Sequence, residues 1–293
     1  MVCLNYRDWS KYNEGLVLRG EFYLDFGFLD SWDAELRLMN EGKRGRPYVY
    51  PEGFVLFTGV IHDFFHLPFR QLEGVLRKLS KHIPGIKAAD YTTLWNRINQ
   101  LVWFVPQENN GSLVVAVDST GLKVTNRGDW LRKKHWYDGK NTARRGWLKV
   151  HIAVDASTKK LLSVKITDEK TGDNEMLQAL VKDLPLKELL GDGAYDSTES
   201  FKYLHTRGLD PPGIRIRENA RSKGLSDRAY AVRERQALGY DKWKEKHRYG
   251  QRWAVEGYFS AVKRCFGETI KATKTENMKK EAQRKFTLYS LLP

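Results

Sequence analysis

Four polar side chains in the C-terminal part of the chain are spaced so that one helix would present them together: Tyr249, Arg252, Glu256 and Lys263. At about 100° per residue, their offsets fall within an arc of roughly 60°. A separate apolar stripe lies beside them, formed by Val255, Phe259, Val262 and Phe266. Such a helix could bury one flank and offer a carboxylate and two cations to a site on the other.

Two aspartates follow apolar stretches where buried strands are expected. Asp118 comes after Leu-Val-Val-Ala-Val at residues 113–117, and Asp192 comes after Leu-Leu-Gly at residues 189–191. Singly, an aspartate at such a place is usually a turn or cap residue. Together with Glu256, the two supply the oxygen ligands that Mg²⁺ prefers, and two such ions about 3.5–4 Å apart can activate the nucleophile and stabilise the leaving oxygen of a phosphodiester. Three carboxylates from separate segments suit such a site.

The spacing Tyr-x2-Arg-x3-Glu-x6-Lys, preceded by the two aspartates, resembles the signature of the DDE-type transposases of insertion sequences, in the branch related to insertion sequences four and five. The likeness runs over nearly the whole chain. It implies a catalytic, metal-binding triad of Asp118, Asp192 and Glu256. It also implies DNA contacts near the cut by Tyr249, Arg252 and Lys263. The cofactor expected from the resemblance is Mg²⁺, with Mn²⁺ as a substitute, in a two-ion site.

The function implied by this resemblance is that of a DNA transposase. It would bind the terminal inverted repeats of its mobile element, cleave the DNA there, and join the 3′-OH to target DNA, acting as a homodimer that pairs two ends. One alternative is an RNase H-like nuclease or resolvase that hydrolyses DNA without strand transfer. Another is a non-catalytic DNA-binding protein descended from a transposase, against which the intact triad argues. A strand-transfer assay separates the first two.

The composition favours a polyanionic partner such as double-stranded DNA. Among 293 residues, 50 Lys and Arg stand against 36 Asp and Glu, which gives a formal net charge of +14. The two cysteines suit a reducing cytoplasm and exclude a disulfide framework or a cysteine-based zinc cluster. The N-terminus lacks a secretory signal, and no apolar stretch is long enough to span a membrane. A prokaryotic, cytoplasmic protein associated with the nucleoid is expected.

Two domains are expected from the change of pattern near residue 109. Strand-like runs at residues 113–118, 147–154 and 161–167 are followed by alternating helices and strands, which indicates an α/β mixed sheet flanked by helices. The resemblance makes residues 109–293 an RNase H-like catalytic domain in which the strands bearing Asp118 and Asp192 are neighbours. Residues 1–108 are expected to form a helical, DNA-binding N-terminal domain.

A helix-turn-helix-like arrangement is predicted within the N-terminal domain. Leu72, Leu76 and Leu79 repeat at helical spacing, and after Pro84-Gly85 so do Tyr91, Leu94, Trp95 and Ile98. Asp90 can cap the second helix. That leaves four side chains on or near its outer side, where they could read a major groove: Thr92, Thr93, Asn96 and Arg97. The alternative is a plain helical bundle that supports the catalytic domain.

A basic segment with interleaved aromatic residues lies between the first two strands. Its cations are Arg132, Lys133, Lys134, Arg144 and Arg145. They could neutralise phosphates while Trp136 or Tyr137 stacks on an exposed base. The alternative is a solvated hairpin whose aromatic rings pack on the sheet.

Three further aspartates have simpler interpretations. Asp196, with Glu199 three residues on, predicts a helix N-cap. Asp155 falls between two strand-like runs and predicts a hairpin turn. Asp173 resembles a helix cap, although a role at the edge of the site stays open for it.

Overall fold

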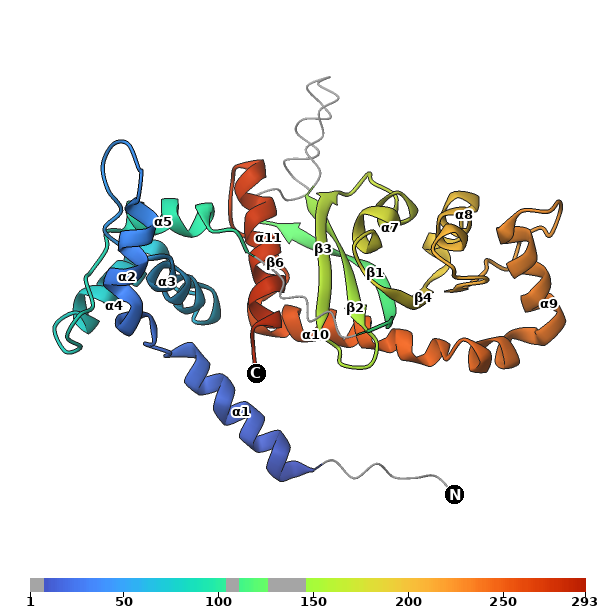
Figure 1. The fold of residues 1–293 in the computed structure, drawn as a ribbon, viewed down its shortest axis with the longest axis horizontal. Helices are drawn as coiled ribbons and strands as arrows, with labels where there is room; N and C mark the ends of the chain where they lie inside the picture. The colour runs from blue at the N-terminus through green and yellow to red at the C-terminus, as the bar shows by residue number, and fades with distance from the viewer. Residues whose placement is uncertain (1–7, 104–110, 126–145) are drawn as a thin grey trace. The chain divides into compact units, whose positions relative to one another are not determined.

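The computed structural model describes residues 8–103, 111–125 and 146–293, which divide between two compact units (Figure 1). The first unit contains residues 1–103 together with 291–293, and the second contains residues 104–290. No helix in these described ranges is long and apolar enough to cross a membrane.

The described part of the first unit is helical, with α1 (Trp9–Tyr23), α2 (Phe28–Asn40), α3 (Glu52–Phe64), α4 (Phe69–Leu79) and α5 (Tyr91–Gln100). Its core is centred on α3, where the ring of Phe54 packs against Phe28 and Trp32 of α2. The α5 helix begins where the Asp90 carboxylate accepts hydrogen bonds from two backbone N–H groups of its first turn. A helical N-terminal region is therefore confirmed.

The second unit is built on a mixed sheet in the order β3-β2-β1-β4-β5, with β6 paired to the far end of β1. The strands are β1 (Leu113–Val124), β2 (Trp147–Asp155), β3 (Leu161–Asp168), β4 (Leu186–Gly191), β5 (Gly213–Ile214) and β6 (Thr269–Ile270). The first three are antiparallel, whereas β4 and β6 run parallel to β1. The central strands are apolar because both faces of the sheet are covered.

Helices cover the sheet on its two sides (Figure 1). Side chains alternate along a strand, so Val115 and Val117 of β1 point to the same face, where they pack with Leu177 of α7 (Asp173–Val181) and with α8 (Thr198–Thr206). The other face is covered by α10 (Trp253–Phe266), which contacts β1 and β2, and by α11 (Thr275–Ser290), which contacts β3. The predicted α/β class, an RNase H-like mixed sheet flanked by helices, is confirmed.

One predicted helix differs in its first turn. The chain leaves α9 (Asp227–Lys246) through Arg248, which has a left-handed backbone with φ of 48°. It then forms the 3₁₀ helix η2 (Tyr249–Arg252) before α10 begins at Trp253. The prediction of one continuous α-helix through Tyr249 and Glu256 is wrong, because the reversal at Arg248 is followed by this tighter turn.

The predicted cap at Asp196 is also wrong. The N-cap of α8 is Ser197, whose side chain accepts from the Ser200 N–H. The buried Asp196 carboxylate instead accepts from Arg228 Nε at 2.5 Å and from the Arg217 N–H at 3.0 Å. The Arg228 guanidinium gives the buried carboxylate an opposite charge as well as two hydrogen bonds, which a helix N–H does not, and this explains the exchange. The hairpin turn predicted at Asp155 is confirmed, with the carboxylate accepting from the Ser157 N–H at 2.9 Å.

Candidate active site

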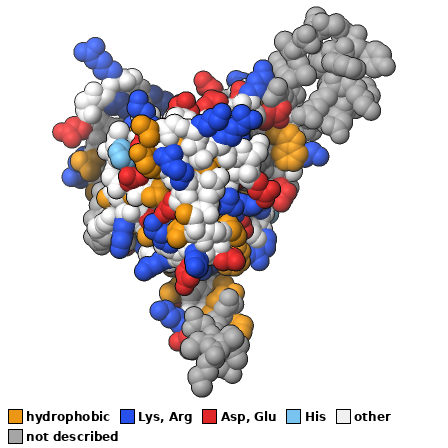
Figure 2. Space-filling view, turned by 90° about the vertical axis from the view of Figure 1, so that its right-hand side faces the viewer, with side chains coloured by type: hydrophobic (Ala, Val, Ile, Leu, Met, Phe, Trp, Pro, Cys, Tyr) orange, Lys and Arg blue, Asp and Glu red, His pale blue; other side chains and the backbone are white. Residues whose placement is uncertain are grey.

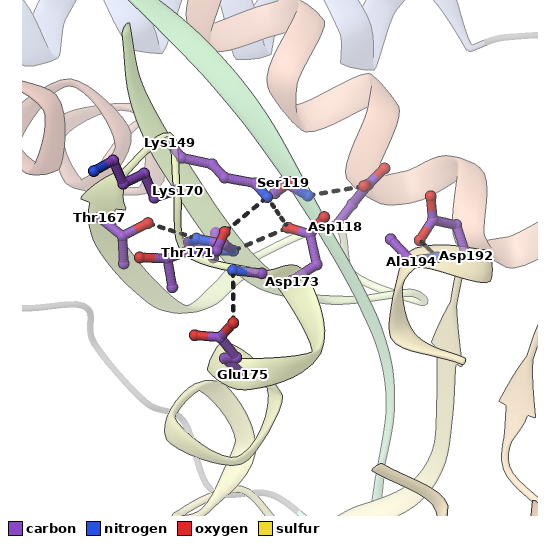
Figure 3. A network of polar contacts seen from close by, with 12 residues as sticks. Asp118, Ser119, Lys149, Thr167, Lys170, Thr171, Asp173, Glu175, Asp192 and Ala194 are labelled. Carbon is purple, nitrogen blue, oxygen red and sulfur yellow. Dashed lines mark hydrogen bonds and ion pairs between the residues drawn. The ribbon is translucent and has the colours of Figure 1, made fainter. Parts of the chain in front are cut away.

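The first two carboxylates of the predicted triad meet because β1 and β4 are parallel neighbours. Ala116 of β1 pairs with Leu190 of β4, and Asp118 and Asp192 each lie two residues further along. Adjacent strands are about 4.8 Å apart, so both aspartates reach the edge of the sheet where β4 ends. Asp192 then caps the 3₁₀ helix η1 (Gly193–Tyr195), accepting from the Ala194 N–H at 2.9 Å (Figure 3).

Glu256 is brought to Asp118 through Arg252. The Arg252 Nη1 lies 3.0 Å from Asp118 Oδ2, and its Nη2 donates to Glu256 Oε1 one helical turn away. The guanidinium is half-buried, whereas the Glu256 side chain is 46% exposed. Glu256 thus reaches the site from its solvent side, and Asp118 reaches it from the sheet.

Three carboxylates and one guanidinium determine the electrostatics of the site. Burial raises the pKa of Asp118, and the charge of Asp192 raises it further, against hydrogen bonds from the Ser119 N–H and Arg252. Burial alone would lower the pKa of Arg252, yet the neighbouring Tyr249, Asp118, Glu256 and Asp192 raise it above its usual value. A cation is therefore strongly favoured at this position.

The donor set suits a hard divalent cation, but the guanidinium stands where a cation would be bound. Carboxylate oxygens from three separate segments are the ligands that Mg²⁺ uses. In the parts of the chain that the structure describes, no three His, Cys, Asp or Glu side chains lie close enough together to hold one ion. Arg252 neutralises Asp118 and Glu256 in this arrangement, so a metal ion would have to displace it from at least one of them.

The two other residues of the predicted signature lie in different surroundings. Tyr249 is only 8% exposed, and its hydroxyl donates to the backbone oxygen of Gly191 at 3.3 Å, directly before Asp192. Burial raises its pKa to about 12. Lys263 lies near the C-terminal end of α10, with Nζ 3.9 Å from the exposed carboxylate of Glu268. Tyr249 therefore supports the Asp192 loop, while Lys263 lies about two helical turns beyond Glu256 on α10.

The predicted groove-reading residues of α5 are largely occupied by contacts within the first unit. The hydroxyls of Thr92 and Thr93 hydrogen-bond to Asp90. The Arg97 guanidinium donates to the backbone oxygen of Tyr50 at 3.1 Å and lies over the ring of Tyr48. Asn96 is exposed.

Asn96 instead belongs to a shallow pocket on α4 and α5, which is lined by Pro68, Phe69, Arg70, Tyr91, Thr92, Trp95 and Asn96. Tyr91 and Trp95 follow the apolar spacing of α5, but each is 38% exposed while Leu94 and Ile98 are buried. A helix packed on one side buries only a narrow stripe, so spacing alone assigned these two rings to the core. Their exposure marks a surface that the sequence did not predict.

Arg132, Lys133, Lys134, Arg144 and Arg145 lie outside the described residues, and their role stays a prediction. On the face that carries α8 and α9, lysine and arginine side chains are scattered among acidic ones and form no single patch (Figure 2).

A second polar network, which the sequence did not predict as a unit, adjoins Asp118. Asp173 begins α7, with Gly172 as its N-cap, so its predicted capping role is replaced by contacts with the sheet. Its Oδ1 lies 3.0 Å from Lys149 Nζ and 3.3 Å from His151 Nδ1, both on β2 (Figure 3). The alternation of Lys149 and His151 along a strand was the sequence feature from which this network could have been predicted.

Two family models, each described as a transposase DDE domain, match the chain at residues 109–291 and at residues 17–127. The first covers more than half of the chain and includes all three carboxylates. The chain belongs to the transposase DDE domain family. Within this transposase, the second match extends from α1 to the strand that carries Asp118.

The transposase is also similar to an uncharacterized protein from Aquifex aeolicus (strain VF5). The two are 24% identical over 290 residues, which cover 88% of this chain and 82% of that protein. The similarity therefore includes both compact units.

Proposed function

We propose that this protein is an insertion-sequence transposase, of the branch related to insertion sequences four and five, that cleaves DNA at the ends of its element and joins them to target DNA. The observation that carries the proposal is the meeting of Asp118 and Asp192, from neighbouring parallel strands, with the Arg252 and Glu256 pair of a separate helix. Membership of the transposase family supports it.

Asp118, Asp192 and Glu256 would hold Mg²⁺, or Mn²⁺ as a substitute, in a two-ion site. The bound ions would activate the attacking oxygen and stabilise the departing one. Because the sheet and η1 fix the two aspartates, Glu256 is the one carboxylate of the three that would have to reorient. This division suits a site that assembles when metal and DNA arrive together.

Arg252 would change partners when a metal ion binds. With a metal ion held by Asp118 and Glu256, the Arg252 guanidinium would be free to direct its fork of N–H donors at a phosphate. Lys263, which lies further along α10, would contact a neighbouring phosphate as a point charge. Tyr249 would act on DNA indirectly, by holding the Gly191 backbone before Asp192.

Recognition of the terminal inverted repeats is assigned to the N-terminal unit, residues 1–108, and phosphate contacts to the basic segment at residues 132–145. The net charge of +14 supports a DNA partner for the whole chain. A homodimer would pair the two ends, and the protein would act at the nucleoid of a prokaryotic cell.

A strand-transfer assay tests the proposal against simple hydrolysis. The purified protein would be incubated with Mg²⁺, a supercoiled target plasmid, and DNA ending in the inverted repeats that flank its gene. Joined product is expected from the wild type and not from Asp192→Asn. Cleavage without joining would instead establish an RNase H-like nuclease or resolvase, and DNA binding without cleavage would establish a non-catalytic protein.

A further inference from the structure

Asp173 is the centre of a polar network that ties three strands to the start of α7. Besides its contacts with Lys149 and His151, its carboxylate hydrogen-bonds to the Ser119 side chain of β1. The other ring nitrogen of His151 lies 2.8 Å from Thr167 Oγ1 of β3. Burial alone would raise the pKa of Asp173, but its hydrogen bonds with His151, Ser119 and Lys149 lower it to about 2.

Burying the polar and charged groups of this network costs free energy, so stability alone does not explain it. His151 is fully buried, and the side chains of Asp173 and Lys149 are only 16% and 22% exposed. Removing charges from water carries a penalty, and well-packed apolar residues in such places are often equally stabilising. A network of this kind is better explained by the geometry that it fixes.

That geometry belongs to the part of β1 that has least support from the sheet. On one side, β1 pairs with β4 only as far as Ala116 and with β6 only from Lys123. Among the described residues, the intervening part of β1 therefore has a strand partner, β2, on its other side alone. Asp118 lies within this half-supported stretch.

Ser119 connects Asp118 with Asp173. Successive side chains of a strand point to opposite faces, so Asp118 and Ser119 leave β1 in opposite directions. The Ser119 N–H donates to Asp118 Oδ1 at 2.8 Å (Figure 3). Ser119 also pairs across the sheet with His151, whose Nδ1 lies 3.3 Å from Asp173, and its hydroxyl hydrogen-bonds to the Asp173 carboxylate. A shift of Ser119 would therefore move the Asp118 carboxylate.

A buried hydroxyl is influenced by Asp173 and by two carboxylates of the triad. Tyr195 is fully buried, and its hydroxyl has no hydrogen-bond partner among the described residues. Burial raises its pKa, and so do the charges of Asp173, Asp118 and Asp192. The charges of all three carboxylates thus act on one buried group.

We infer that Asp173 is a positioning residue, which holds Ser119 and thereby fixes the Asp118 carboxylate in the orientation needed for metal binding. The inference rests on the proposed function, since it is that function which gives Asp118 a metal ion to bind. Partners that orient metal ligands typically change metal affinity by about 10–100-fold when they are removed.

The test measures Mn²⁺ affinity by calorimetry, the Mn²⁺ dependence of end cleavage, and thermal unfolding. The variants are Asp173→Asn, Ser119→Ala and the conservative Ser119→Thr. The matched control is Asp155→Asn, which removes a buried carboxylate at one end of the same strand pair, where its side chain is bonded to its own turn.

Asp173→Asn and Ser119→Ala should weaken Mn²⁺ binding at least about tenfold and shift the cleavage curve to higher Mn²⁺, whereas Ser119→Thr and Asp155→Asn should not.

Wild-type Mn²⁺ affinity in a folded Ser119→Ala protein would overturn the inference, even if Asp173→Asn fails to fold. That result leaves the proposed function intact, provided that Asp118→Asn abolishes Mn²⁺ binding and cleavage. If wild type and Asp118→Asn alike bind no Mn²⁺ and cut no DNA, the proposed function falls and the inference with it.

Discussion

Arg252 sets the charge of the site at the scale of single residues. Its guanidinium is shared by the buried Asp118 and the exposed Glu256, and the nearby Asp192 adds a third negative charge. This pair of contacts joins the sheet to α10 at the site. In the proposed function, the same side chain would exchange these carboxylates for a DNA phosphate.

Arg252→Ala should destabilise the metal-free protein, because Asp118 then keeps a half-buried charge without its partner. A loss of about 1–3 kcal/mol in the free energy of unfolding is expected. Mn²⁺ should recover more stability in this variant than in the wild type, since the ion replaces the missing cation. Thermal unfolding with and without Mn²⁺ measures both effects. Arg228→Ala is the control, because it breaks the Asp196 pair elsewhere and should show no metal-dependent recovery.

Glu256→Gln and Lys263→Ala should fail in different ways although both change α10. Glu256→Gln removes a metal-ligand charge, so cleavage should be lost at every salt concentration. Lys263→Ala should weaken engagement of the DNA end, leaving cleavage that recovers at low salt as phosphate attraction strengthens. The contact of Lys263 with the exposed Glu268 is long and weak, and does not compete strongly with DNA.

Titrating cleavage against Mn²⁺ and against salt distinguishes the two roles. Recovery of Glu256→Gln at low salt, or a changed metal requirement in Lys263→Ala, would refute the assignment.

At the scale of elements, α5 presents a different face from the one that its sequence predicts. Asn96→Ala and Arg70→Ala should each reduce discrimination between repeat and unrelated DNA, by about 1–3 kcal/mol for a base-reading contact, and leave stability unchanged. Arg97→Ala should instead lower the free energy of unfolding, because its guanidinium holds the Tyr50 backbone. Gel-shift titration with competitor DNA and thermal unfolding separate the two outcomes. Equal discrimination by the Asn96 variant and the wild type would remove this pocket from recognition.

The junction between α9 and η2 should make stability depend on pH through His247. This ring is buried, with Nδ1 3.6 Å from Glu188 and Nε2 3.4 Å from Glu234, which also pairs with Lys246. Burial alone would lower the pKa of His247, but the two glutamates raise it above 6.5. A raised folded-state pKa means that the stabilisation is complete below pH 6.5 and is lost as pH rises through the folded value.

Denaturation midpoints measured at several pH values from 6 upward should therefore fall more steeply for the wild type than for His247→Gln. Parallel curves would show that His247 does not contribute in this way.

The sequence predicts elements well where the pattern is local and poorly where contacts are distant. The apolar run before Asp118 predicts β1 because a short run rich in valine is typical of a strand buried on both faces. The placement of Arg252 between two carboxylates joins residues 134 positions apart, and no local pattern contains it. The same limit applies to Asp196, whose local sequence resembles a helix cap but does not indicate the ion pair with Arg228. It also applies to Tyr249, whose helical spacing does not indicate the 3₁₀ turn.

At the scale of the whole molecule, recognition and chemistry are assigned to separate units. The base-reading candidates lie on α4 and α5 in the first unit, and the three carboxylates lie in the second. Substitution of one of these carboxylates should consequently abolish cleavage and leave DNA binding intact. This separation makes a catalytic variant with intact DNA binding the decisive test of the account.

That test is the cleavage of DNA carrying the element's ends by the wild type, Asp118→Asn and Asp192→Asn in Mg²⁺, with binding followed on the same DNA by gel shift. Both substitutions nearly preserve side-chain volume and remove one charge from the site. We expect the wild type to cut at the end of the element, and both variants to bind this DNA as tightly as the wild type without cutting it. Cleavage by either variant at the wild-type rate would contradict the assignment of these carboxylates as the metal-dependent site.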